Sequence, residues 1–254
     1  SILGIAREAQ AILPRFGLKA KLKNDVPNRK GYKFVKKVNY LEATVDKSLC
    51  YRFTAVLIKN VTIKDSPKEI KSLLEKVGVR PINNIVDISN FIMHETGQPI
   101  HTFDYDKIGG HKMILRQSRK GEKVTTLDDK VHTLFGGDIV MEDGAGRLID
   151  LCGIMGGKES AIDENTKNVL LFVQTYNHKK IRETSMGLAH RTEAAVLFEK
   201  QVDPELVTLG TLKSIELIEK YSNGKTEKEI LDIYPKPYKT NYITIDLAFI
   251  EKMI

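Results

Sequence analysis

The chain has 254 residues, of which 41% are hydrophobic, so it is long enough to bury a sizeable core in one large domain or two small ones. No run approaches the roughly 20 consecutive apolar residues of a membrane span, and the N-terminus lacks a secretory signal, so we expect a cytoplasmic protein without a membrane partner. Cys50 and Cys152 give neither a disulfide framework nor a zinc signature, and we expect both to be reduced.

The formal charge is +7, and its basic excess is concentrated in residues 19–37, where Asp25 is the only acidic residue. Such a balance favours a polyanionic partner, because binding to phosphates releases counterions. Lysine-rich surfaces are also common in proteins that never bind nucleic acid. The segment is therefore either a solvated linker or a strip that contacts RNA.

The first part of the chain predicts one helix and one strand. Residues 1–13 place apolar side chains at helical spacing, and Pro14 closes that helix. Residues 14–48 show no sustained periodicity, and we interpret them as a connector. Residues 51–63 alternate and are rich in β-branched side chains, which is typical of a strand.

A second helix has the clearest boundary signals in the sequence. Ser66 is the expected N-cap, Pro67 occupies the first helical position, and Glu69 completes a capping box. Gly78 then ends the helix, as glycine commonly does.

The rest of the chain mixes helices and strands without a regular βαβ order, which predicts an α+β domain and not a doubly wound sheet. A final helix runs to residue 221, capped by Asp203 and Pro204 and stopped by Gly224. The other expected elements are a helix at residues 85–93, a hairpin at 125–134, and strands at 113–117, 138–142, 148–152 and 169–175.

The end of the chain predicts a boundary. A proline-broken linker follows Ile233, and residues 242–254 have the pattern of a strand and helix that begin another domain. We therefore divide the chain into an N-terminal helix and basic connector at 1–48, a central module at 49–222, and a linker with the truncated start of a following domain at 223–254.

The glycine-rich segment GIMGG at residues 153–157 follows an apolar run, so its backbone can turn sharply and approach a ligand closely. It lacks the GxGxxG pattern and the GK[ST] ending of nucleotide loops. A loop whose amides face an uncharged ligand or a ribose, a purely structural turn and, less readily, a phosphate cradle remain open.

Histidine and aspartate residues supply the other candidates. His101 is either a satisfied polar residue or a catalyst. His94 lies seven positions earlier, but no cysteine or carboxylate spacing accompanies the pair, so we expect no metal. Asp128 and Asp129 are adjacent, which favours turn chemistry over paired acid and base catalysis.

Several motifs together resemble the β subunit of bacterial phenylalanyl-tRNA synthetase. They are RPINNIVDISNFIMHETGQPIHTFD at residues 80–104, GIMGG at 153–157 and HRTEA at 190–194. SILGIARE at residues 1–8 is similar to the helix that follows the family's N-terminal tRNA-binding insert. The resemblance covers about residues 51–218, the module that hydrolyses tyrosine mischarged onto the phenylalanine tRNA.

This resemblance implies a fold and a cleft. In the family the module is an α+β unit with mixed or antiparallel sheets and flanking helices, and its cleft binds the misacylated 3′ end of the tRNA. The positions that match cleft residues are Arg80, His101, Gly153, Thr192 and Ala194. His101 is the candidate catalytic residue among them, and the others are expected to bind substrate.

The resemblance also implies partners and cofactors. The expected partners are phenylalanine tRNA and the α subunit, in an α2β2 heterotetramer. ATP and magnesium are implied for the full enzyme, whose synthetic site lies in the α chain, while we expect no cofactor in this fragment.

One position departs from the family pattern. Phe172 stands where the family places the glutamate that reads the tyrosine hydroxyl, and a phenyl ring has no group for that contact. Tyrosine-selective hydrolysis is therefore expected to be reduced or lost, unless Gln174 or Glu193 has taken over the contact. The alternatives are a non-catalytic structural and tRNA-contact module, or an unrelated RNA-binding protein.

Overall fold

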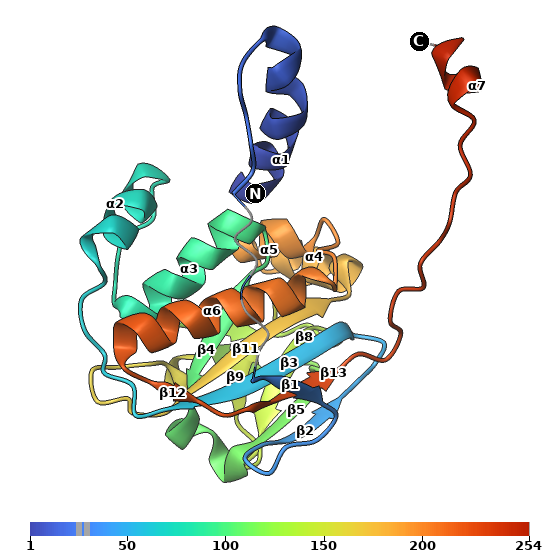
Figure 1. Cartoon of the computed structure of the whole chain (residues 1–254). Coiled ribbons are helices and arrows are strands. Elements are labelled where there is room, and N and C mark those ends of the chain that lie inside the picture. The colour runs from blue at the N-terminus through green and yellow to red at the C-terminus, as the bar shows by residue number, and fades with distance from the viewer. Residues whose placement is uncertain (24–26, 28–30, 254) are drawn as a thin grey trace.

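The computed structural model describes residues 1–23, 27 and 31–253, and it has three layers. Helices α3 (Asn84–Thr96) and α6 (Leu206–Ser222) lie across one face of a mixed sheet, and a second sheet packs against the other face (Figure 1). Among the described residues no helix has the length and apolar character needed to cross a membrane.

The first sheet has the strand order β1-β13-β3-β11-β4, with β12 also paired to β3. Only β1 and β13 pair in parallel among the strands described in this sheet. The strands are β1 (Lys33–Val35), β3 (Cys50–Lys59), β4 (Ile100–Asp104), β11 (Val169–Tyr176), β12 (Lys225–Thr226) and β13 (Glu229–Ile233).

The second sheet has the order β10-β9-β8-β5-β2, and β2 runs parallel to β5. A separate hairpin joins β6 (Lys123–Thr125) to β7 (Val131–Thr133). The strands of the second sheet are β2 (Glu42–Val45), β5 (Lys112–Gln117), β8 (Ile139–Asp143), β9 (Leu148–Leu151) and β10 (Met155–Gly156). These mixed sheets with helices on one outer face confirm the expected α+β class.

The remaining helices lie at the edges of these layers or beyond them. They are α1 (Ile2–Ile12), α2 (Lys68–Lys76), α4 (His178–Gly187), α5 (Glu193–Phe198) and α7 (Leu247–Glu251). Short 3₁₀ helices occur at η1 (Leu13–Phe16), η2 (Tyr105–Lys107), η3 (Gly109–His111) and η4 (Lys158–Ser160).

Strand β11 is buried on both faces, which explains its continuous apolar run. Side chains alternate along a strand, so Leu170 and Phe172 enter the core between the two sheets. Leu171 and Val173 face the other way, into the core beneath the helices. One strand therefore separates two hydrophobic cores.

Strands also form in segments that we interpreted as connector or linker. β1 and β2 lie within residues 14–48, and β13 lies after residue 223 and pairs with both β1 and β3. Arg52 on β3 also makes a double hydrogen bond to Asp232 on β13, at 3.0 and 2.8 Å. Such short strands carry too little alternation to be recognised from the sequence. The predicted domain division remains a prediction.

Two local expectations were wrong. Helix α2 starts at Lys68, so Pro67 and not Ser66 is its N-cap residue and no side chain caps it; the Ser66 hydroxyl donates to the buried Asp87 carboxylate, at 2.5 Å. The strand expected at the start of residues 242–254 does not form. That segment pairs with no strand in the described structure, and a strand without a partner leaves its backbone groups unpaired.

Within the basic segment at residues 19–37, Asp25, Arg29 and Lys30 lie outside the described residues.

Candidate functional site

A hollow of about 60 Å³ lies where β4 and β11 of the first sheet meet the β9–β10 turn and helix α5. The polar side chains in its wall come from His101, Asp150 and Gln174. Gly153 and Ala194, two positions expected from the sequence, also line it. Residues from four distant parts of the chain thus meet in one place.

His101 sits on β4, directly opposite Phe172 on β11. Its ring packs edge-on against Phe103, with 4.4 Å between the ring centroids. The ring keeps some exposure through the hollow, but the surrounding protein excludes enough water to lower the pKa of His101 to about 4. At neutral pH the imidazole is therefore uncharged and can accept a proton or a hydrogen bond.

The glycine loop makes close approaches that a larger residue would block. A Cβ atom at Gly156 would lie 2.6 Å from Nε2 of His101. Gly153 adopts a φ of +72°, and a Cβ atom there would lie 2.6 Å from Cδ1 of Ile181. Gly156 therefore brings the loop against the imidazole, and Gly153 lets it pack on Ile181.

Thr192 connects this loop to helix α5. Its hydroxyl donates to the carbonyl oxygen of Ile154 at 2.8 Å, and its oxygen accepts from the amide of Ala195 at 3.2 Å as the N-cap of the helix. The hydroxyl thereby sets the position of Ala194 in the wall of the hollow.

Asp150 and Gln174 place polar groups in the same wall, and each is only 3% exposed. The Gln174 side-chain oxygen has no hydrogen-bond partner among the described residues. Burial raises the pKa of Asp150 to about 7. Gln174 was one of the alternatives open from the sequence, whereas Asp150 was not recognised, because its only signal was a single carboxylate inside the apolar run LIDLC.

The raised pKa of Asp150 predicts a pH-dependent stability. Between about pH 4 and pH 7 the unfolded chain ionises this carboxyl while the folded chain keeps it protonated, so stability falls as pH rises through that window. In the parent, the free energy of unfolding should fall by about 3–4 kcal/mol between pH 4 and pH 8, and Asp150→Asn is expected to abolish this fall. Urea unfolding of both proteins at these two pH values measures it, and equal losses would contradict the assignment.

Three other residues named in the sequence analysis lie outside the hollow. Phe172 is 0% exposed and packs against Phe53, with 4.8 Å between the ring centroids. Glu193 turns toward His94, with 3.1 Å between carboxylate oxygen and ring nitrogen. Arg80 is exposed between α2 and α3 and makes no hydrogen bond or ion pair among the described residues. Neither Phe172 nor Glu193 supplies a polar group to this cavity.

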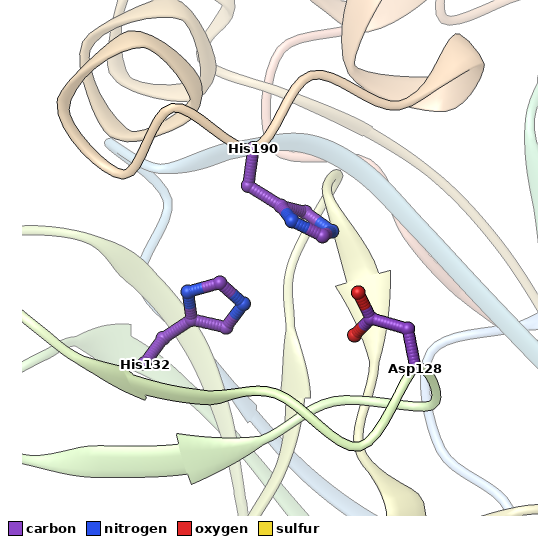
Figure 2. A group of neighbouring side chains, drawn as sticks. All are labelled: Asp128, His132 and His190. Carbon is purple, nitrogen blue, oxygen red and sulfur yellow. The ribbon is translucent and has the colours of Figure 1, made fainter.

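A second group of side chains was not anticipated. Asp128, His132 and His190 each offer a ligand atom, and these atoms lie within 4.8 Å of one another (Figure 2). The spacing of four between Asp128 and His132 was the only sequence signal, because His190 comes from a distant segment. Asp128 and Asp129 do lie in the hairpin turn, as the sequence indicated.

Comparison with known proteins places the chain in a family. The family model described as the B3/4 domain matches residues 49–223. The chain belongs to the B3/4 domain family. The B3/4 match includes the residues of the hollow and of the histidine cluster.

Curated relatives of this B3/4 chain are named phenylalanine–tRNA ligase β subunit. The protein from Clostridium acetobutylicum is 37% identical over 100% of the chain and 31% of its own length. The one from Thermotoga maritima is 34% identical over the same shares, and the one from Staphylococcus aureus is 41% identical over 70% and 22%. The chain thus spans about a third of the length of the first two relatives.

A solved N-terminal fragment of the phenylalanyl-tRNA synthetase β subunit from Pyrococcus horikoshii aligns with 87% of the chain and 61% of the fragment. The TM-score is 0.47 at 14% identity, a likeness too weak to support an argument about geometry.

Proposed function

We propose that this B3/4 chain is part of a phenylalanine–tRNA ligase β subunit, and that its hollow hydrolyses tyrosine mischarged onto phenylalanine tRNA. The relatives' shared name supports the ligase assignment. The observation that carries the hydrolytic role is a neutral imidazole, His101, beside a buried carboxyl and amide in one cavity. The partners in this proposal are the tRNA and the α subunit of a cytoplasmic α2β2 enzyme, whose α chain uses ATP and magnesium.

Hydrolysis of an aminoacyl ester needs few catalytic groups from the protein. An aminoacyl ester is already reactive, so hydrolysis requires mainly a held water and fixed donors for the developing oxyanion. His101 has the protonation state of a general base at neutral pH. Its position is set by the packing of Phe103 and by the close approach of Gly156.

Discrimination requires a group that reads the extra hydroxyl of tyrosine. An apolar pocket rejects an added hydroxyl poorly, whereas a site that hydrogen-bonds the hydroxyl disfavours phenylalanine, which leaves buried polar groups unpaired. Phe172 cannot make this contact. Asp150 and the unpartnered oxygen of Gln174 offer it from the same wall, and we assign the reading of the hydroxyl to them.

The size of the hollow favours a second candidate function. A volume of about 60 Å³ accommodates a few water molecules and not an aromatic ring. Substrate entry therefore requires movement of a lining residue, and Met155 has the most adaptable side chain among them. If no lining residue moves, the domain is a structural and tRNA-contact module without hydrolytic activity.

A deacylation assay with the complete α and β enzyme separates the two functions. We expect tyrosyl-tRNA of phenylalanine specificity to be hydrolysed faster than correctly charged phenylalanyl-tRNA. A double substitution of Asp150→Ala and Gln174→Ala should reduce this preference by about tenfold or more, because the hydroxyl loses its partners. Glu164→Gln, which neutralises an exposed carboxylate, serves as the control. A parent enzyme that binds the tRNA but leaves the ester intact would support the non-catalytic module.

A further inference from the structure

The cluster of Asp128, His132 and His190 joins two separate parts of the fold. Asp128 lies in the turn of the β6–β7 hairpin, and His132 lies on β7. His190 lies in the short connection between α4 and α5. Figure 2 shows all three side chains directed toward a common centre.

The two histidines are buried without hydrogen bonds at their Nε2 atoms. His132 is 8% exposed and His190 is 9% exposed, and neither Nε2 has a partner among the described residues. The rings meet edge to face, with 4.8 Å between their centroids. A buried nitrogen without a partner costs free energy, so both Nε2 atoms are available to bind a ligand.

Asp128 contributes the negative charge of the cluster. Its carboxylate accepts a hydrogen bond from the Thr126 hydroxyl at 2.6 Å and pairs with Lys130 at 2.9 Å, and these contacts hold the pKa of Asp128 well below its usual range. Burial and the neighbouring His190 lower the pKa of His132. Neutral imidazole and ionised carboxylate are the forms in which these side chains bind a metal ion.

These donors match one class of cation. Imidazole nitrogen and carboxylate oxygen bind zinc at about 2.0–2.2 Å, which separates two tetrahedral ligand atoms by about 3.3 Å. Here the atoms lie within 4.8 Å, so small side-chain rotations close the gap. The hydrogen bond from Thr126 to Asp128 is the kind of outer contact that orients a metal-binding carboxylate.

We propose that Asp128, His132 and His190 form a binding site for a zinc-type divalent cation, with one coordination position open. The ion links the β6–β7 hairpin to the α4–α5 connection. His190, its ligand in that connection, lies two residues before Thr192, whose hydroxyl positions the wall of the hollow. Zinc binding at these three residues requires no hydrolytic activity in the hollow. It replaces the expectation from sequence that this chain holds no metal.

Equilibrium dialysis of the 254-residue chain against zinc sulfate, with metal analysis of the protein, tests the site. We expect one zinc per chain. His132→Gln and His190→Gln keep a polar side chain but remove a ligand, and each should weaken zinc binding by at least about tenfold. Cobalt bound to the parent should give the visible absorption of a nitrogen-and-oxygen site, and both variants should lose it.

His111→Gln is the matched control, because His111 is exposed and stacks on Tyr105 elsewhere in the fold. It should bind zinc as the parent does, and circular dichroism should show that all variants are folded. Absence of stoichiometric zinc from the parent would overturn the proposal. So would unchanged binding by the folded His132→Gln and His190→Gln proteins.

Discussion

Replacing His101 with glutamine is expected to slow hydrolysis of tyrosyl-tRNA by about 10²–10⁴-fold, the range that a general base contributes. Glutamine can hold a water by hydrogen bonding but cannot take its proton. The loss should appear in kcat and not in KM, because in the proposed mechanism the imidazole acts on the water and not on tRNA binding. Single-turnover deacylation with the complete enzyme measures both quantities.

A pH profile separates this chemical role from a structural one. Since the pKa of His101 lies at about 4, its contribution to the rate should stay constant from pH 5 to pH 8 and decline only below that range. A rate change near pH 7 belongs instead to Asp150, whose pKa is about 7, and should disappear in Asp150→Asn. Full activity of His101→Gln would remove His101 from the mechanism and leave the cavity to other groups.

Replacing Phe172 with alanine is expected to lower the free energy of unfolding by about 3–5 kcal/mol. The ring is fully buried between the two sheets, where it packs on Phe53 and Phe103 with 4.8 and 5.8 Å between ring centroids. Alanine leaves a cavity that these neighbours fill only in part. Urea unfolding gives the change as a lower midpoint with an unchanged slope.

Phe172→Leu is the matched control and should cost less than half as much as alanine, because leucine refills most of the volume. Phe172→Glu should destabilise the protein as well, since it places a carboxylate in an apolar core, where the paired residues are Ala55 on β3 and His101 on β4. A stable glutamate variant that also gained hydrolytic activity would show that this side chain reaches the hollow, contrary to the packing described above.

Much of the fold followed from local patterns. Period-two alternation and apolar runs located β3, β5, β8, β9 and β11, and helical spacing located α1, α2, α3 and α6. The short strands β1, β2 and β13 escaped notice because their stability comes from partners far away in the chain. Strand β4, which carries His101, was missed for the same reason.

The candidate site was predicted only in part. His101, Gly153 and Ala194 do meet in one hollow, and Thr192 holds its wall. Arg80 does not line the hollow, and the buried ring of Phe172 does not reach it. The reduced or lost tyrosine-selective hydrolysis that we expected stays a prediction, and Gln174, one of the two side chains weighed as a replacement for the glutamate, lines the hollow with Asp150.

The sequence by itself determined the family, the α+β class and the residues able to carry chemistry, because these depend on local order along the chain. Only the tertiary structure decided which of them meet. Whether a side chain faces a cavity, a core or a neighbouring histidine depends on strand register and on contacts between distant segments. The fold therefore brings Asp150 into the same hollow as His101, and His190 into contact with His132. The sequence pattern predicted neither pairing.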